Sequence, residues 1–309
     1  MKKKKIIISG LDNAGKTSIL TAFDKRYDFE KEIIELEPTI RVNYHNTEFL
    51  GKEIYIWDMG GQKMYRELYE SKQDVYFSNT DLLIYVIDIQ DNARFEASLE
   101  YLNKILQYFE RTKVKVPLIV AFHKFDPELR DNENFIKFAR ILTEKLIQLE
   151  QLEMLFLQTS IYDILSIVQL ISSALSIFDE GYSELKGLFK NYLKYFESKS
   201  IILFDQNGVI ISEFYTDSFE LELYVGLLNA IKEHIILLKK IQEENSKQKG
   251  KFFLKPINNH LISYLHRIKI KNQIFYISVL IQEKAKETLL DKFSDFLVEL
   301  NRILEPMLS

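Results

Sequence analysis

Hydrophobic and polar positions follow two different patterns along the chain. Up to about residue 178, short apolar runs alternate with stretches of helical periodicity such as Phe95–Phe109 and Asn132–Leu149. This alternation predicts a mostly parallel six-stranded sheet with helices on both faces. Two of the strands are expected to pair antiparallel, because only Gly51 separates them. The expected strands are Lys5–Ser9, Arg41–Leu50, Lys52–Trp57, Leu82–Asp88, Pro117–Phe122 and Met154–Thr159.

After residue 180 the pattern changes. Apolar residues share one helical face from Leu185 to Phe196, and a long helix is expected over roughly Glu220–Gln242, before a polar loop, 243–250. A closing helix follows over Leu289–Leu304. The order α-β-β-α-β-β-β-α predicts an α+β domain on a five-stranded antiparallel sheet, so we expect domains 1–180 and 183–309. Its strands are expected at Ser200–Phe204, Val209–Phe214, Phe252–Ile257, Ile262–Lys269 and Gln273–Ile281.

Composition narrows the possible functions. The 309 residues are 47% hydrophobic with a net charge of −4, so nothing favours nucleic acid as a partner. The absence of cysteine excludes disulfides and thiol catalysis and fits a reducing compartment. The basic run Lys2–Lys5 fits a solvated approach to the first strand better than a membrane-binding patch. No apolar stretch reaches the roughly 18 residues of a membrane span, and lysine at position 2 excludes N-myristoylation, so we expect no direct lipid anchor.

The stretch GLDNAGKTS follows the first strand and begins a helix. It fits the phosphate-loop pattern G-x-x-x-x-G-K-[ST], whose backbone N–H groups surround phosphate oxygens at the positive end of a helix dipole. Lys16 is expected to neutralise the β- and γ-phosphates, and Thr17 to bind Mg²⁺ through its hydroxyl. The expected nucleotide-binding residues of the loop are Gly10, Asp12, Asn13, Ala14, Gly15, Lys16, Thr17 and Ser18.

Two further elements predict a GTP-dependent switch. Asp58 ends an apolar strand, where an aspartate can hold Mg²⁺ through water. The Gly61 N–H can approach the γ-phosphate, and Gln62 can orient an attacking water as the catalytic residue. Thr39 lies between these elements, where its hydroxyl can complete the Mg²⁺ shell and GTP can order residues 28–40.

The stretch HKFD, residues 123–126, predicts which base is bound. A carboxylate at Asp126 can accept hydrogen bonds from two guanine N–H groups, a donor pair that adenine lacks. Lys124 is expected to lay its methylene chain on the ring and keep its charge in solvent. His123, also expected among the nucleotide-binding residues, mainly ties the loops together and can contact the base at N7. In the stretch Thr159-Ser160-Ile161, both Ser160 and Ile161 are expected to bind the nucleotide, and the N–H of Ser160 is expected to bind the guanine carbonyl.

Together these stretches resemble a Ras-superfamily GTPase over roughly residues 5–178. GLDNAGKTS and GGQ are similar to the Arf-like branch, whereas His123 in place of the usual asparagine is characteristic of the Rag/Gtr family. The stretches IWDMGGQ, LLIYVIDI and TSIYD resemble the Rag A/B (Gtr1) type. That family carries a C-terminal roadblock-type domain with the element order expected here. Met59 and the pair Glu37-Pro38 depart from its animal and fungal pattern.

This resemblance implies partners and a location. It implies a dimer with a second Rag-type GTPase through the C-terminal domains, and activating and exchange proteins as regulators. It also implies a role in amino-acid sensing upstream of the TOR kinase. The protein is then expected in the cytoplasm and, through a roadblock-type membrane scaffold, on a lysosomal or vacuolar surface.

Two functions remain compatible with the sequence. The first is a regulatory GTPase that uses GTP, GDP and Mg²⁺, with slow hydrolysis without an activating partner, because Asp12 occupies a position near the γ-phosphate and no arginine is evident in cis. The second is a GTP-stabilised scaffold with little hydrolysis, acting in membrane-associated complex assembly. Gln62 favours the first.

Overall fold

The computed structural model describes residues 3–25, 36–50, 52–148, 154–178, 181–205, 210–216, 227, 252–256 and 260–308. Two compact units divide the chain, Met1–Ala174 and Leu175–Ser309. The domain limits 1–180 and 183–309 stay predictions. The long helix expected over 220–242, apart from Leu227, and the polar loop 243–250 lie outside the described residues, as do residues 28–35.

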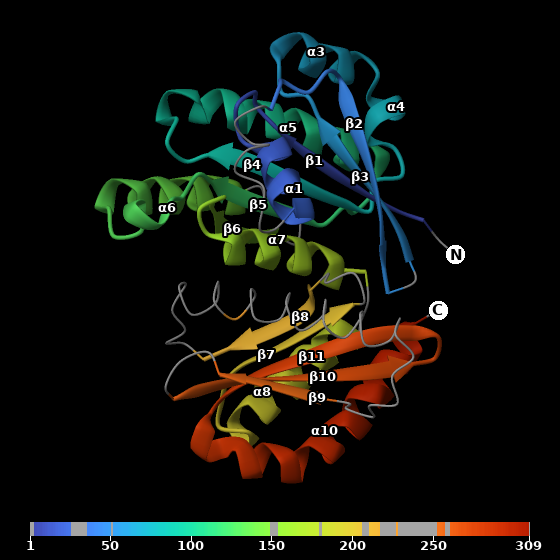
Figure 1. Cartoon of the computed structure of the whole chain (residues 1–309). Helices are drawn as coiled ribbons and strands as arrows, with labels where there is room; N and C mark the ends of the chain where they lie inside the picture. The colour runs from blue at the N-terminus through green and yellow to red at the C-terminus, as the bar shows by residue number, and fades with distance from the viewer. Residues whose placement is uncertain are drawn as a thin grey trace. The chain divides into compact units, whose positions relative to one another are not determined.

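A six-stranded mixed sheet forms the first unit (Figure 1). Its strand order is β2-β3-β1-β4-β5-β6, and the antiparallel pairing of β2 with β3 confirms the hairpin expected on either side of residue 51. The other neighbouring strands are parallel, as the alternation of strands and helices predicted. The strands are β1 (Lys4–Gly10), β2 (Val42–Phe49), β3 (Lys52–Met59), β4 (Leu82–Asp88), β5 (Leu118–His123) and β6 (Met154–Thr159).

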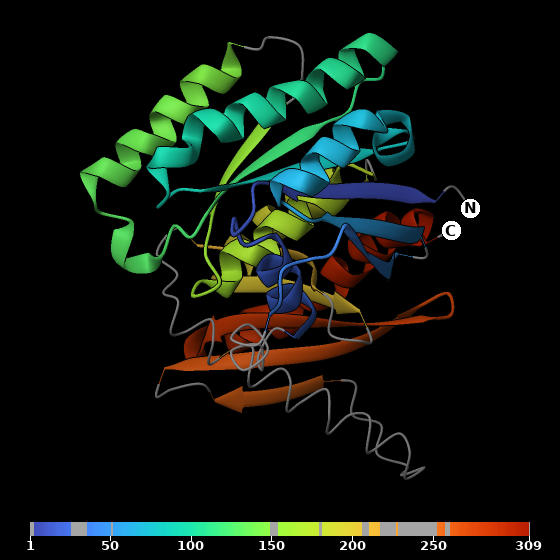
Figure 2. The same cartoon turned by 90° about the horizontal axis from the view of Figure 1, so that it is seen from above.

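Helices cover both faces of this sheet (Figure 2). The helices are α1 (Lys16–Lys25), α3 (Lys63–Ser71), α4 (Gln73–Phe77), α5 (Phe95–Thr112), α6 (Glu133–Ile147) and α7 (Ile164–Ser176), and the short 3₁₀ helices are η1 (Asn92–Arg94) and η2 (Pro127–Leu129). Apolar side chains of α3, α4, α5 and α6 form one core with alternate residues of the central strands. The helices α1 and α7 lie on the opposite face (Figures 1 and 2).

The parallel strands explain where the site lies. Because β1, β3, β4, β5 and β6 run in the same direction, their carboxyl ends meet at one edge of the sheet. The polar residues that end these strands or follow them therefore come together although they are far apart in sequence. These residues include Asp58, Asp88, His123 and Ser160, together with the loop that begins at Gly10.

The second unit is an α+β structure on a five-stranded antiparallel sheet of order β8-β7-β11-β10-β9. Its helices α8 and α10 pack against each other and lie on one face of the sheet, where Phe196, Phe293 and Phe296 meet (Figure 1). The elements are α8 (Gly181–Tyr195), β7 (Ser198–Asp205), β8 (Ile210–Tyr215), β9 (Phe252–Pro256), β10 (Leu261–Ile270), β11 (Gln273–Gln282), η3 (Glu283–Ala285) and α10 (Lys286–Met307). All five strands expected in this half of the chain are present.

None of the described helices combines the length and the apolar character that a membrane-spanning helix requires.

Candidate functional site

The loop between β1 and α1 has the backbone geometry of an anion cradle. Gly10, Asn13 and Gly15 adopt positive φ angles of 148°, 58° and 91°. A Cβ on Gly10 would lie 2.3 Å from the Val86 carbonyl oxygen, so only glycine lets the loop leave β1 beside β4. The loop ends at Lys16, the first residue of α1, whose backbone N–H groups begin the helix. The residues of the predicted phosphate loop thus lie together around a helix N-terminus.

Lys16 is buried inside this loop. Its ammonium group donates hydrogen bonds to the carbonyl oxygens of Leu11 at 2.7 Å and Gly10 at 3.2 Å. Burial lowers the pKa of Lys16 to about 8, although the nearby carboxylates of Asp58 and Asp12 act in the opposite direction. A buried cation held only by neutral carbonyls is poorly compensated, which favours the approach of an anion.

Three side-chain oxygens converge beside this lysine. Thr17 Oγ1 donates to Asp58 Oδ2 at 2.6 Å and lies 2.8 Å from Thr39 Oγ1, which is itself 3.2 Å from Asp58 Oδ2. Asp58 is fully buried, and its Oδ1 has no hydrogen-bond partner among the described residues. A buried carboxylate oxygen without a donor is costly, which makes it a ready ligand for a cation.

These oxygens fit Mg²⁺. This ion takes hard oxygen ligands and keeps several waters, so one or two protein oxygens plus phosphates suffice. Within the described part of the chain, no group of three or more His, Cys, Asp or Glu side chains gathers to hold a metal by itself. The donor set therefore suits a magnesium ion bound together with a phosphate ligand, and the assignment of Thr17, Thr39 and Asp58 to this metal stays a prediction.

The Gly60-Gly61 pair joins β3 to the phosphate loop. A Cβ on Gly61 would lie 2.3 Å from the backbone nitrogen of Asp12, and one on Gly60 would lie 2.6 Å from the Thr39 carbonyl oxygen. The Gly60 N–H also donates to the Arg41 carbonyl at 2.6 Å. Any larger side chain at these positions would push the three segments apart, so the glycines permit their close approach.

These segments line one cleft of about 290 Å³. Its walls come from the phosphate loop, from residues 36–39 and from the Gly61-Gln62 pair. Gln62 is the N-cap residue of α3, and its side chain makes no capping hydrogen bond. The residues predicted to bind phosphate and metal, and the predicted catalytic glutamine, thus border a single space. They are Asp12, Asn13, Gly15, Lys16, Thr17, Ser18, Thr39, Gly61 and Gln62.

His123 is buried at the end of β5 and packs against the phosphate loop. A Cβ on Gly15 would lie 2.3 Å from the His123 Cδ2 atom, and His123 Nδ1 lies 3.0 Å from Thr159 Oγ1. Burial, assisted by the charge of Lys124, lowers the pKa of His123 to about 3, so the ring is neutral at neutral pH. The histidine joins the loops around β1, β5 and β6, the role predicted for it.

The carboxylate of Asp126 is held from two sides. Ser160 Oγ donates to its Oδ1 at 2.6 Å, and the Gln90 side-chain amide donates to its Oδ2 at 2.9 Å. Gln90 also donates to the Lys124 carbonyl at 2.7 Å. The residue predicted to recognise the base therefore has a fixed orientation.

Two details differ from expectation at this end of the site. Lys124 does not leave its charge in solvent but pairs with Asp88 at 2.7 Å, and its backbone has a positive φ of 60°. The Ser160 N–H, expected to bind the guanine carbonyl, donates to Ser166 Oγ at 3.0 Å. That assignment is wrong in this geometry because Ser166, in the first turn of α7, already accepts the hydrogen bond from this N–H. Ile161, half-buried next to it, offers the following backbone N–H.

Sequence reasoning missed several polar residues around the site. Asp88 and Gln90 end β4 or follow it, so their position at the carboxyl edge of the sheet could have indicated them. Arg130 forms an ion pair with Asp163, which joins the loop after β5 to the loop after β6. Arg94 also contacts the phosphate loop, through Asp12, and no local motif indicated it.

Comparison with known proteins relates the first part of the chain to one family. The model of the ADP-ribosylation factor family matches residues 1–172. The chain is 40% identical over 130 residues to "ADP-ribosylation factor-like protein 3" of Chlamydomonas reinhardtii, covering 41% of this chain and 67% of that protein. It is 36% identical over 121 residues to "ADP-ribosylation factor-like protein 5" of Caenorhabditis elegans, covering 39% and 62%. The match thus spans about two thirds of the length of these relatives.

Among solved structures, the Arl6 BBS3 small GTPase of Trypanosoma brucei with a bound nucleotide analogue, GppNp, aligns with a TM-score of 0.44 and 20% identity. The alignment covers 57% of this chain and 98% of that structure.

Proposed function

The chain belongs to the ADP-ribosylation factor family of small GTPases, and we propose that its first unit works as a molecular switch with the site at the carboxyl edge of the sheet as its centre. Proteins of this family bind GTP or GDP with Mg²⁺ and hydrolyse GTP, and this chain is a GTPase of that kind. The observation that carries the proposal is the cleft that gathers the phosphate loop, Thr39, Gly61 and Gln62 beside the buried Asp58.

Each part of the cleft then has a task at the phosphates. The N–H groups of the loop and the Lys16 ammonium bind the β- and γ-phosphates. Thr17 and Thr39 would hold Mg²⁺ through their hydroxyls and Asp58 would hold it through water, and the ion would neutralise phosphate charge. The Gly61 N–H contacts the γ-phosphate, and Gln62 orients the attacking water as the catalytic residue.

At the other end of the site, Asp126 accepts hydrogen bonds from guanine while Ser160 and Gln90 keep its carboxylate in place. The methylene chain of Lys124 covers the base, and Ile161 supplies a backbone N–H to the guanine carbonyl. His123 supports the phosphate loop by packing closely against Gly15.

Switching follows from the position of Thr39. Its hydroxyl is hydrogen-bonded to Thr17 and Asp58, the residues proposed to bind the metal. The metal and the γ-phosphate can therefore fix the segment that contains Thr39. Loss of the γ-phosphate would release that segment. Regulators and effectors of a small GTPase recognise this difference, and we propose that unaided hydrolysis is slow and that an activating protein accelerates it.

The rate of GTP hydrolysis distinguishes the second candidate, a GTP-stabilised scaffold, from the switch. The switch predicts that the full chain converts bound GTP to GDP and that Gln62→Leu lowers the rate at least about tenfold without weakening GTP binding. Candidate activators should accelerate the wild type only. Equally negligible rates in the wild type and the variant, with and without activators, would favour the scaffold. Unaided turnover of several GTP per second would contradict slow intrinsic hydrolysis.

We also propose the narrower assignment to a Rag/Gtr-type GTPase whose domains are 1–180 and 183–309. His123 in the base-recognising stretch and the α+β second unit support it. In this proposal the second unit is a roadblock-type domain that dimerises with a related GTPase. Light scattering on the full chain, alone and mixed with a related two-domain GTPase, should then give the mass of a dimer, and monomers in both samples would refute it.

A nutrient-signalling role upstream of a TOR-type kinase, at a lysosomal or vacuolar surface through a roadblock-type scaffold, belongs to the same proposal. A pull-down with the Gln62→Leu protein loaded with GTP tests it. Recovery of a second two-domain GTPase and a roadblock-type scaffold is the expected result. Recovery of neither, in a source where both are expressed, would contradict it.

A further inference from the structure

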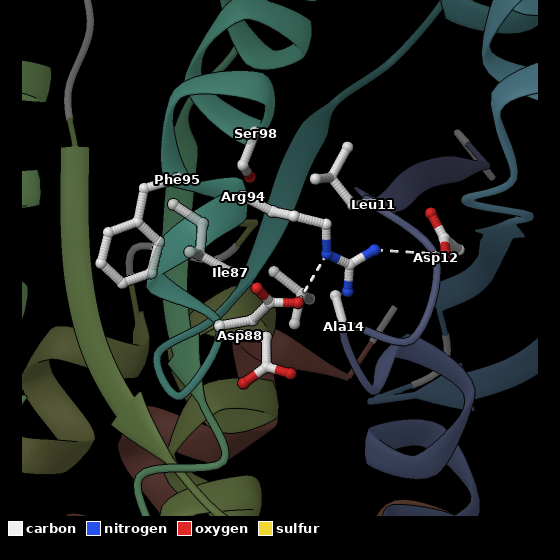
Figure 3. A pocket seen from close by; sticks show the side chains of 10 residues that line it. Leu11, Asp12, Ala14, Ile87, Asp88, Arg94, Phe95 and Ser98 are labelled. Carbon is white, nitrogen blue, oxygen red and sulfur yellow. Dashed lines mark hydrogen bonds and ion pairs between the residues drawn. The ribbon is translucent and has the colours of Figure 1, made fainter.

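Arg94 connects the beginning of α5 with the phosphate loop. Its Nε donates to Asp91 Oδ2 at 2.6 Å, and its Nη1 donates to Asp12 Oδ2 at 3.2 Å. Figure 3 shows the guanidinium group extending from Arg94 toward Asp12, across a pocket that Leu11 and Ala14 of the loop also line. Asp91 fixes one edge of the guanidinium group, so the other edge is directed at Asp12.

Asp12 lies between this pocket and the nucleotide cleft. It lines both, and a Cβ on Gly61 would lie only 2.3 Å from its backbone nitrogen. Gly61 is the residue whose N–H is proposed to contact the γ-phosphate. A carboxylate at Asp12 therefore brings a negative charge to the side of the cleft where GTP carries an additional phosphate and GDP does not.

The same region holds the other charges that act on a terminal phosphate. Lys16 lines the nucleotide cleft together with Asp12, and Arg94 lies on the other side of Asp12, in the neighbouring pocket. Because it is bonded to Asp12, its positive charge offsets the carboxylate on the side where the γ-phosphate is expected.

Resting on the proposed binding of GTP at this cleft, we propose that Arg94 is a positioning residue that neutralises Asp12 and thereby allows the triphosphate to bind as well as the diphosphate. Arg94 acts through Asp12 and not on the γ-phosphate itself. The Asp12 side chain is 49% exposed and that of Arg94 33%, so solvent screens the pair and its effect on nucleotide preference is moderate.

The test compares GDP with a non-hydrolysable GTP analogue in competition against a fluorescent guanine nucleotide, using the full chain with Mg²⁺. Arg94→Gln removes the charge and should weaken GTP-analogue binding about fivefold relative to GDP. Arg94→Lys keeps the charge and should preserve most of the wild-type ratio. Arg111→Gln is the matched control, since Arg111 lies at the far end of α5 and bonds Gln73, and its ratio should equal that of the wild type.

The decisive variant is the double substitution Asp12→Asn with Arg94→Gln. With the carboxylate gone there is nothing to neutralise, so the double variant should have the same GTP-to-GDP ratio as Asp12→Asn alone. The proposal is overturned if Arg94→Gln weakens both nucleotides equally, or if the double variant keeps the fivefold defect. A fall in the rate of hydrolysis with unchanged affinities would also overturn it, because Arg94 would then act in the transition state. Failure of the wild type to bind any guanine nucleotide would instead refute the proposed function itself, and the inference with it.

Discussion

The two ends of the nucleotide site differ in how their polar groups are satisfied. At the phosphate end, Asp58 Oδ1 is buried without a partner among the described residues, and burial lowers the pKa of Lys16 to about 8. At the base end the charged and polar side chains already bond one another. Asp126 is held by Ser160 and Gln90, and Lys124 pairs with Asp88.

This difference separates two tasks. A group that is buried without a partner gains most when a ligand arrives, so the phosphate end is where metal and phosphates should contribute affinity and where the γ-phosphate can be sensed. A side chain held in place loses little freedom on binding, so the base end is suited to discrimination between purines.

Asp126→Asn should change base specificity most. Replacing the carboxylate by an amide removes an acceptor for the guanine donors and supplies a donor suited to the second carbonyl of xanthine. The ratio of GTP to xanthosine triphosphate affinity should therefore fall by about 10⁴-fold. Competition binding with both triphosphates measures it. Asp131→Asn, an exposed carboxylate beyond η2, serves as control and should leave the ratio unchanged. A ratio preserved in Asp126→Asn would show that another residue recognises the base.

Asp58→Asn should act at the phosphate end and only when metal is present. An amide cannot replace the carboxylate charge beside Thr17, so GTP affinity in Mg²⁺ should fall by about 10²-fold. In EDTA, the wild type and the variant should bind GTP to within about threefold of each other. Titration of a fluorescent GTP analogue in both conditions measures the difference. The same loss with and without Mg²⁺ would mean that Asp58 supports the fold and not the metal.

The binding of a nucleotide should also cause proton uptake by Lys16, at the phosphate end. The pKa of Lys16 is lowered to about 8, so at pH 8.5 most of this side chain is neutral in the free protein, and phosphates that bind the ammonium form must raise its pKa. GDP binding should then take up about 0.7 proton at pH 8.5 and about 0.1 at pH 7. Calorimetry in two buffers of different ionisation enthalpy measures the uptake, and equal values at both pH values would contradict the assignment to Lys16.

His123→Asn should affect stability rather than affinity. The pKa of His123 is lowered from 6.5 to about 3, so below pH 6.5 the unfolded chain binds a proton that the folded state does not, and the wild type loses stability as pH falls toward 3. From pH 7.5 to 5 this loss should amount to about 2 kcal/mol relative to the variant. Urea unfolding followed at Trp57, the single tryptophan, reports on this unit. GTP affinity should change less than about threefold, and abolished binding would contradict the supporting role of His123.

Much of this site could be predicted from sequence because its residues belong to short continuous motifs. GLDNAGKTS and GGQ specify loop conformations through glycine and specify chemistry through Lys16, Thr17 and Gln62. The strands were equally accessible, since buried runs such as β4 are continuous and apolar, and every strand end lies within two residues of the expected position.

The parts that were missed depend on contacts between distant segments. The ion pair of Arg94 with Asp12 joins residues 82 positions apart, and it forms because β4 lies beside β1 in the sheet. The hydrogen bond from the Ser160 N–H to Ser166 Oγ depends on how the first turn of α7 begins. Neither could be derived from local periodicity, which carries no information about the order of strands or about which donor reaches a given acceptor.

The most direct test of the account compares GTP, GDP, ATP and guanosine as competitors for the wild-type protein, in Mg²⁺ and in EDTA. A site with a ligand-dependent phosphate end and a preorganised base end should bind GTP and GDP tightly in Mg²⁺. It should bind ATP at least about 10³-fold more weakly, guanosine weakly, and GTP with a clear loss in EDTA. Equal competition by ATP and GTP would contradict the role given to the base end, and GTP affinity that is unchanged in EDTA would contradict the role given to the phosphate end.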